Sequence, residues 1–357
     1  MSFRSPRSQS EDRLTHKGIP LLAKPTRLSY IAMTSYRVLF TAVLIWPTIA
    51  HAQTPELDPL LSEYKPVSGI AGGSLKFAGS NTMANILSLW SEDFRRFYPG
   101  IRFEIDGKGS AIAIPSLIEG QSAFGLMSRP PTKVEQSNFK IRHGYEVVTL
   151  EIGIDTVAFF VNKQNPLEGL AFPEIDAIFS STRIRGAKRR AELWRDFLPS
   201  EEWQSQPVTC YGRNSASGTY GFVRQFVLKN GDYGNWVSEE SGSAAVVNGV
   251  SKSRGGIGYG GIGYKTNDVK ALKICERRGG ELVEPTFQNA YSGKYPLSRF
   301  LYLAINFDSR TQLDPHRREF IRYVLSRQGQ ERVREAGFLP INQRITERVL
   351  ARLSAKD

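Results

Sequence analysis

Hydrophobic and polar positions between residues 74 and 128 follow a strand–helix–strand pattern. Leu75–Ala78 and Ile101–Ile105 are short apolar or alternating runs of the kind that forms strands. Between them, apolar residues from Met83 to Phe97 recur at spacings of three and four, which predicts an amphipathic helix that ends before Pro99. Phe124–Ser128 predicts a third strand. This alternation predicts an α/β fold.

The later part of the chain continues the alternation and contains two long apolar runs. Asp155–Asn162 is nearly all apolar, as a strand that is buried on both faces would be, and Phe300–Ile305 is similar. The other predicted elements are strands at Tyr145–Leu150 and Val269–Cys275, and helices that begin near Ala111, Phe172, Gly242, Phe320 and Gly329. We expect Gly337–Pro340 to end the core.

Small polar residues stand at three junctions between a predicted strand and a helix. These turns are Gly79–Thr82, Gly107–Ser110 and Arg213–Thr219, and in the third Ser217 is placed to cap the helix. A helix N-terminus attracts anions through its free N–H groups and its dipole, and Arg213 would add a charge-assisted contact. One such turn is equally typical of an ordinary capped helix, but three together indicate a ligand crevice beyond the strand ends.

The composition is that of a globular protein and excludes some functions. Of the 357 residues, 40% are hydrophobic and 23% are charged, which is typical of a folded chain long enough for two lobes. The net charge of +12 could favour anionic partners. Nucleic acid is not an expected partner, because no long basic block has interleaved aromatic residues. The basic stretch Ser180–Arg195 is either a docking patch for an acidic partner or a solvated loop.

The N-terminal segment has the order of a secretory signal peptide. Arg37 precedes the short apolar run Val38–Trp46, and Ala50-His51-Ala52 follows as a small-x-small cleavage site. We therefore expect cleavage after Ala52 and a periplasmic protein, and Met33 is an alternative start to Met1. The apolar run is too short to span a bilayer, so stable membrane insertion is not expected.

Residue types that would indicate a metal site, a cofactor or catalysis are scarce. The two cysteines, Cys210 and Cys275, lie in apolar runs where a buried free thiol is commoner than a disulfide. The sequence has no CxxC pair and no two histidines at metal-ligand spacing, so no metal is expected. Gly256–Gly261 has the letters GxGxxG but not the helix that must follow in a dinucleotide site. No GxSxG surrounds any serine, and we expect neither a cofactor nor an enzyme.

Several motifs follow one another in a familiar order. They are Phe77–Thr82, Gly107–Ser110, Phe124–Arg129, Arg213-x-x-x-Ser217-Gly218-Thr219, Ile257-Gly258-Tyr259, Tyr295–Arg299 and Gly337–Pro340. Through them, residues 74–345 resemble the periplasmic phosphate-binding proteins of phosphate ABC transporters. No single motif decides the resemblance, but their order and spacing together are fairly specific.

The resemblance implies a two-lobed α/β clamshell, a periplasmic-binding-protein fold with two crossover strands. Lobe one would comprise residues 74–155 plus 296–357, and lobe two residues 156–295, with the crossovers near Asp155 and Tyr295. Residues 1–52 would precede them as the signal peptide, and residues 53–73 as a mobile leader.

The resemblance also implies which residues bind the ligand. The family buries phosphate with hydroxyls, N–H groups at helix starts and an arginine. The matching positions here are Ser80, Asn81, Thr82, Met83, Ser110, Arg129, Arg213, Ser217, Gly218 and Thr219. Where Arg129 stands, well-known members have an aspartate that accepts a proton from phosphate and repels sulfate. Because arginine cannot accept a hydrogen bond, another acid such as Asp106 or Asp155 would have to do so. Alternatively, Arg129 pairs with the ligand or lies in a salt bridge.

The implied function is the capture of inorganic phosphate by a monomer and its delivery to an ABC permease. The sequence leaves three alternatives. The protein could bind another oxyanion such as sulfate or molybdate, it could be a phosphate sensor or surface protein with the same fold, or it could be a serine hydrolase, which the missing catalytic motif disfavours.

Overall fold

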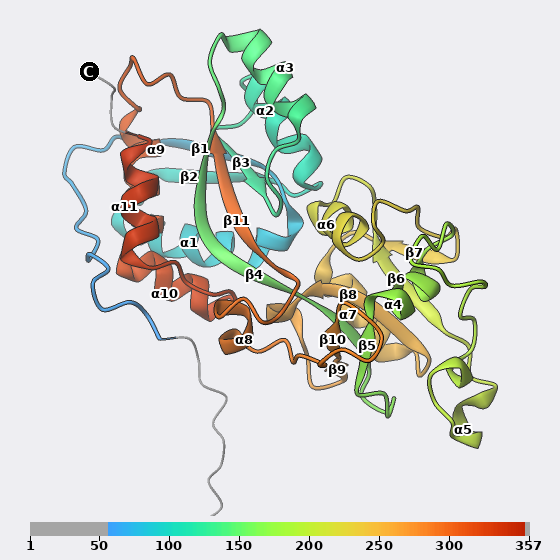
Figure 1. Ribbon diagram of the computed structural model, residues 1–357. Coiled ribbons are helices and arrows are strands. Elements are labelled where there is room, and N and C mark those ends of the chain that lie inside the picture. The colour runs from blue at the N-terminus through green and yellow to red at the C-terminus, as the bar shows by residue number, and fades with distance from the viewer. Residues whose placement is uncertain (1–55, 354–357) are drawn as a thin grey trace, which may run out of the picture. The chain divides into compact units, whose positions relative to one another are not determined.

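A nine-stranded mixed sheet runs through the protein (Figure 1). The computed structural model describes residues 56–353, so the predicted signal peptide and cleavage site lie outside the described residues. The strand order is β2-β1-β3-β11-β4-β8-β6-β7, with β9 also paired to β4, and a separate two-stranded sheet pairs β5 with β10. The α/β class predicted from the pattern is confirmed.

Strands and helices alternate along most of the described chain. The strands are β1 (Gly73–Gly79), β2 (Ile101–Asp106), β3 (Phe124–Met127), β4 (Val148–Asn162), β5 (Gly169–Ala171), β6 (Thr209–Arg213), β7 (Val237–Glu240), β8 (Gly256–Gly261), β9 (Val269–Ala271), β10 (Lys273–Cys275) and β11 (Ser298–Ile305). The α-helices are α1 (Ala84–Phe97), α2 (Ala113–Ile118), α3 (Lys133–His143), α4 (Phe172–Phe179), α5 (Glu201–Gln204), α6 (Gly218–Phe226), α7 (Ser243–Lys252), α8 (Phe287–Tyr291), α9 (Pro315–Val324), α10 (Arg327–Glu335) and α11 (Gln343–Ala351). The 3-10 helices are η1 (Asn81–Met83), η2 (Ser110–Ile112), η3 (Trp194–Asp196) and η4 (Ile262–Tyr264).

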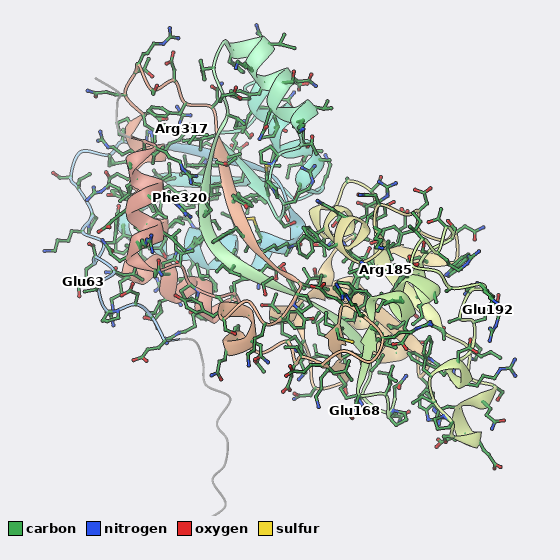
Figure 2. The ribbon with its side chains drawn as sticks, in the orientation of Figure 1. Glu63, Glu168, Arg185, Glu192, Arg317 and Phe320 are labelled. Atoms are coloured by element: carbon green, nitrogen blue, oxygen red, sulfur yellow. The ribbon has the colours of Figure 1, made fainter. Side chains whose placement is uncertain are left out.

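The first hydrophobic core packs α1, α9 and α10 against strands β1, β3 and β11. Phe320 lies on α9 in this core (Figure 2). Its ring contacts those of Phe77, Phe94 and Phe124 at centroid separations of 5.2, 5.3 and 5.2 Å. Helices α2 and α3 bury a smaller apolar cluster that includes Met127 of β3. β3 and β11 are thus covered by helices on both faces, as expected for strands that are largely apolar.

The second hydrophobic core lies around the second half of β4 and strands β6 and β8. Phe159, Phe179 and Tyr259 are fully buried in it, and α7 adds Val246 and Val250 in an adjoining cluster. The first core draws on residues 64–152 and 301–349, whereas the second draws on residues 157–297. These two clusters are called the first core and the second core below.

One continuous strand, β4, joins the two cores. Its residues 148–156 pair with β11, and residues 157–162 pair with β8 and β9. The prediction of two strands at Tyr145–Leu150 and Asp155–Asn162 is therefore wrong. Polar and glycine residues interrupt the apolar pattern at Glu151 and Gly153, but both residues are paired with β11, which keeps the backbone extended.

Two other predicted elements differ from the structure. Val269–Cys275 is two strands in different sheets, because β9 pairs with β4 while β10 pairs with β5. The letters GxGxxG lie inside the buried strand β8 and not in a turn that opens a helix. This placement removes the geometry that a dinucleotide site would need.

Both ends of the described chain pack onto the first core. Leu57, Leu61 and Tyr64 are buried, and Tyr64 Oη lies 2.8 Å from Tyr98 Oη. For residues 56–73, the prediction of a mobile leader is therefore wrong. The prediction that Gly337–Pro340 ends the core is also wrong, because α11 follows and buries Val349 in the first core.

Within residues 56–353, no helix combines the length and apolar character needed to cross a bilayer. The same part of the chain has no group of three or more histidine, cysteine or acidic residues placed to hold a metal ion. Cys210 and Cys275 are both free and buried, in agreement with the sequence interpretation.

Candidate anion-binding site

The turns that follow β1, β2, β3 and β6 lie at the carboxyl ends of these strands, where open α/β sheets bind ligands. β1 pairs in parallel with β2 and β3, which brings three of these turns to one edge of the sheet. The turn after β6 leads into α6 from the second core. The residues that meet there are called the hydroxyl cluster: Ser80, Thr82, Ser110, Ser128, Ser217 and Thr219.

Three serine hydroxyls in the turns that follow β1, β2 and β3 contact one another. Ser80 Oγ donates to Ser128 Oγ at 3.0 Å, and Ser110 Oγ lies 3.3 Å from Ser128 Oγ and accepts the Ser128 N–H at 3.1 Å. All three residues are at most 2% exposed. Gly218 approaches them so closely that a methyl group there would overlap the oxygens of Ser110 and Ser128. Glycine is therefore required where the start of α6 meets the serines.

Helix α6 presents its N-terminus to the hydroxyl cluster. Ser217 caps it by accepting the N–H groups of Thr219 and Tyr220 at 3.2 and 3.4 Å. The cap does not take up the N–H of Gly218, which points from the positive end of the helix dipole. Thr219 Oγ1 lies 3.0 Å from Thr82 Oγ1, so the turn after β1 meets the start of α6 here.

Arg213, the last residue of β6, is a buried cation held only by neutral acceptors. It is 2% exposed, and its guanidinium donates to the carbonyls of Glu240 and Ser241, each at 3.2 Å, and reaches Ser243 Oγ at 3.5 Å. Among residues 56–353, no carboxylate oxygen lies within 4.0 Å of it. Burial lowers the pKa of Arg213, and the neighbouring Arg299 charge acts in the same direction. A buried charge without a counter-charge is costly, so this position favours an anion.

A second buried arginine, Arg299 of β11, stands beside α6 with its counter-charge. Its Nε and Nη2 donate to Asp155 Oδ2 at 3.1 and 2.8 Å. The same guanidinium donates to the Gly218 carbonyl at 3.1 Å and to Thr219 Oγ1 at 2.7 Å. Asp155 is fully buried, and its Oδ1 has no hydrogen-bond partner within the described chain. Asp155 thus carries a free acceptor oxygen, and Arg299 links this residue to Thr219 of the cluster.

The structure brings together most of the residues that the motifs implied. Ser80, Thr82, Ser110, Ser217, Gly218 and Thr219 lie in or against the cluster, and Asn81 contacts Gly242, beside the loop that holds Arg213. The Met83 N–H instead donates to the Ser80 carbonyl at 3.2 Å. Arg129 donates to Glu135 at 2.7 and 2.8 Å, which is the salt-bridge alternative. The ligand-binding roles of these residues remain predictions.

Sequence reasoning did not place Ser128 and Arg299 in the site. The sequence contained a signal for Ser128, because this serine directly follows a strand that is buried throughout. It therefore stands at the carboxyl end of a strand, as Ser80 does. The sequence also contained a signal for Arg299, because an arginine at the start of a buried apolar run requires a counter-charge. Asp155 likewise stands at the start of an apolar run, in β4. No local pattern shows that these two residues pair.

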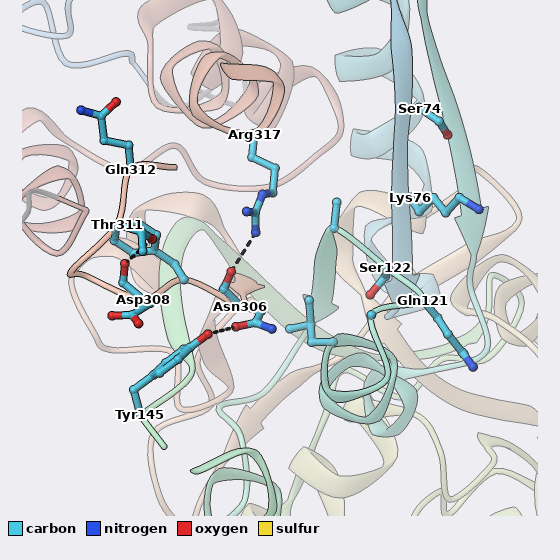
Figure 3. Close-up of a pocket in the computed structure, with 14 residues that line it drawn as sticks. Ser74, Lys76, Gln121, Ser122, Tyr145, Asn306, Asp308, Thr311, Gln312 and Arg317 are labelled. Carbon is cyan, nitrogen blue, oxygen red and sulfur yellow. Dashed lines mark hydrogen bonds between the residues drawn. The ribbon is translucent and has the colours of Figure 1, made fainter. Parts of the chain in front are cut away.

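A separate pocket of about 640 Å³ lies at the opposite edge of the sheet, near the start of β1 and β3 (Figure 3). Tyr145 donates to Asn306 Oδ1 at 2.7 Å, and Arg317 donates to the Asn306 carbonyl at 2.8 Å. Its cations, Lys76 and Arg317, are already paired with Glu104 and Asp314. The pocket therefore lacks the uncompensated charge that distinguishes the hydroxyl cluster.

Three arginines of the basic stretch Ser180–Arg195 make contacts with other parts of the chain. Arg185 donates to the Phe226 carbonyl at 2.7 Å and packs over the ring of Phe172. Arg190 lies over the ring of Trp236, and Arg189 bonds to Asp196. Arg185, Arg189 and Arg190 are therefore engaged within the chain, and the two interpretations of the stretch, a docking patch or a solvated loop, stay predictions.

The chain is similar to known proteins in both sequence and fold. Residues 66–328 match the family model described as a PBP superfamily domain. The phosphate-binding protein PstS of Pseudomonas aeruginosa is 41% identical over 304 residues, which cover 85% of this chain and 94% of that protein. Two solved structures share the fold. One, from Clostridium perfringens, is a substrate-binding protein provisionally assigned to a phosphate ABC transporter, with bound phosphate (TM-score 0.64, 22% identity, 76% of this chain and 100% of that one). The other is an ABC-type phosphate transport receptor from Vibrio cholerae (0.58, 20%, 75% and 100%).

Proposed function

The chain belongs to the PBP superfamily and, within it, to the family of phosphate-binding PstS proteins, and from this premise we propose that it captures inorganic phosphate between its two cores. The observation that carries the proposal is Arg213, a buried guanidinium with no carboxylate partner among the described residues. A tetrahedral oxyanion would supply the missing charge and accept from Arg213, from the N–H of Gly218 and from the cluster hydroxyls.

We propose Asp155 as the residue that makes the site select phosphate over sulfate. A carboxylate can only accept hydrogen bonds, so it favours an anion that still carries a proton. Phosphate carries one at neutral pH, whereas sulfate does not. The free Oδ1 of Asp155 is buried, and its other oxygen is bound by Arg299. Asp106, the other acid considered, is half-exposed and pairs with Lys108, which makes it the poorer candidate.

The test is isothermal titration of the protein in phosphate-free buffer with phosphate and, separately, with sulfate. We expect phosphate to bind at least about tenfold more tightly, because an unprotonated oxyanion would face a buried acceptor. Asp155→Asn should reduce this preference, and Asp106→Asn is the matched control that should leave it unchanged. Heat with sulfate or molybdate but none with phosphate would reassign the protein to another oxyanion.

We propose that the two cores are the two lobes, with residues 74–155 and 296–357 in one and residues 156–295 in the other. The division of buried residues near 155 and 297 supports this proposal. Ligand binding would close the lobes by hinge motion. Small-angle scattering should then show a smaller radius of gyration with phosphate than without it, and an unchanged radius would contradict the lobe assignment.

The proposal has three further parts: delivery to an ABC permease, export through a signal peptide cleaved after Ala52, and a monomeric state. Restoration of phosphate uptake in a strain that lacks the gene would support transport. A strain that keeps full uptake would favour the sensor or surface role. N-terminal sequencing of the exported protein tests the cleavage site, and sedimentation tests the monomer.

Catalysis is the least supported alternative. The members of the family are substrate-binding proteins and not enzymes. His143 contacts Asn306 and His316 contacts the Ala71 carbonyl, so within residues 56–353 no imidazole bonds to a hydroxyl of the cluster. Turnover of a chromogenic phosphate ester that is lost in Ser217→Ala would be needed to revive a hydrolase.

A further inference from the structure

The short helix η4 of the second core reaches the start of α1 in the first core. Tyr264 Oη donates to the Thr82 carbonyl at 3.0 Å and lies 3.2 Å from Asn85 Oδ1 and 3.4 Å from the Asn81 carbonyl. Thr82 and Asn81 belong to η1, the turn that supplies Thr82 to the hydroxyl cluster. Tyr264 therefore contacts the back of a turn whose front faces the site.

The neighbouring glycine makes a backbone contact with the same part of the first core. A methyl group at Gly263 would lie 2.6 Å from the Ala336 carbonyl oxygen and 3.0 Å from Gly337 Cα, and one at Gly337 would overlap Gly263 Cα. Asn85 Nδ2 donates to the same Ala336 carbonyl at 2.8 Å. Tyr264 and Gly263 thus touch a single surface, made of η1, the first turn of α1 and the end of α10.

The two sides of this contact belong to different cores. Ile262 and Tyr264 pack against the α7 cluster of the second core, whereas Met83 and Ala336 are buried in the first core. The contact therefore links the two cores. Burial raises the pKa of Tyr264 to about 12, so the phenol stays a hydrogen-bond donor at neutral pH.

We infer that η4 is a closure latch, in which Tyr264 is a positioning residue for η1 and the backbone contact of Gly263 with Gly337 sets where closure stops. This inference rests on the proposed function, because it assumes that the cores close on an anion. The latch would hold the ligand by stabilising the closed arrangement without touching the ligand. Its loss should therefore speed release while association keeps its rate.

The experiment measures phosphate affinity, association and release rates, and the radius of gyration with and without phosphate. Tyr264→Phe removes one hydrogen bond and keeps the ring, and it should raise the release rate roughly 3- to 10-fold. Gly263→Ala inserts a methyl group where backbone atoms stand, and it should weaken affinity roughly tenfold or more and reduce the compaction on binding. Both variants should keep the wild-type melting temperature without ligand.

The matched control is Gly221→Ala in α6, where a methyl group would lie 3.8 Å from Arg129 Cδ, an ordinary contact. This variant should bind and compact like the wild type. Lower ligand-free melting temperatures with unchanged release and compaction would overturn the latch, because they would show a permanent joint between the cores. A wild type that binds no phosphate would instead overturn the proposed function, and a wild type that binds while Tyr264→Phe and Gly263→Ala behave identically to it would overturn the latch alone.

Discussion

Arg213 and Arg299 are two buried arginines in opposite electrostatic states. Arg213, on β6, is bound only by backbone carbonyls and one distant serine hydroxyl. Arg299, on β11, donates twice to the buried carboxylate of Asp155. Burial lowers the pKa of both guanidinium groups, but only Arg299 has an aspartate that counteracts the effect. The charge of Arg299 is thus neutralised within the fold, whereas the charge of Arg213 has no carboxylate partner among the described residues.

The comparison indicates which of the two arginines stabilises the fold and which one binds the ligand. A paired buried charge is destabilising to break, because its partner is left alone in a low-dielectric interior. An unpaired buried charge costs stability in the free protein and regains it when an anion binds. Arg299 should therefore matter to folding first, and Arg213 to binding first.

The largest effect is expected when the paired charge is removed. Arg299→Met leaves the Asp155 carboxylate buried and uncompensated, and it should lower the free energy of unfolding by about 3–5 kcal/mol. Urea unfolding without phosphate measures the change. The double variant Asp155→Leu with Arg299→Met should recover most of the loss, because both charges are gone. If the double variant is as unstable as Arg299→Met, the ion pair is not the cause.

Removal of the unpaired charge should act on binding. Arg213→Met should weaken phosphate affinity roughly 30-fold or more, since a buried charged contact to the ligand is lost. The free energy of unfolding without phosphate should be equal to or higher than that of the wild type, because an uncompensated buried charge is removed. Titration calorimetry and urea unfolding test both halves. A variant that binds normally but unfolds easily would reverse the assignment of the two arginines.

Thr219 connects the two regions and should have an intermediate effect. Its Oγ1 accepts from Arg299 at 2.7 Å and lies 3.0 Å from Thr82 Oγ1. Thr219→Val keeps the shape but leaves these groups unsatisfied, and phosphate affinity should fall about tenfold. The exposed Thr209 of β6 provides the control, since Thr209→Val should titrate like the wild type.

The smallest effect is expected at Arg129, whose partner lies nearer the surface. Burial would raise the pKa of Glu135, but hydrogen bonds from Arg129 and Thr132 outweigh it and lower the pKa below its ordinary value. This pairing stabilises the fold above the unfolded pKa of about 4.3 and is lost as pH falls through the lower folded pKa. Glu135→Gln should cost about 1 kcal/mol at pH 7 and nothing at strongly acidic pH, by urea unfolding. Glu146→Gln, in an exposed pair with Lys140, should show no such change.

Much of the fold and part of the site could be predicted from the sequence. The helical spacing from Met83 to Phe97, the strand at Phe124 and the helix Phe172–Phe179 depend on near neighbours, and the structure has them. The family was also predictable, because its motifs are short and ordered, and it is confirmed. The break between β9 and β10 and the continuity of β4 were not predictable, since pairing with distant strands decides them.

The sequence by itself determined the alternation of strands and helices, the small polar turns at their junctions and the cation at the end of β6. The tertiary structure alone decided that Asp155 neutralises Arg299 across 144 residues of chain, while Arg213 donates only to neutral acceptors among the described residues. The physical reason is one of range. Periodicity and capping act over a few residues, but the energy of a buried charge depends on which distant groups the fold places within a few ångströms of it.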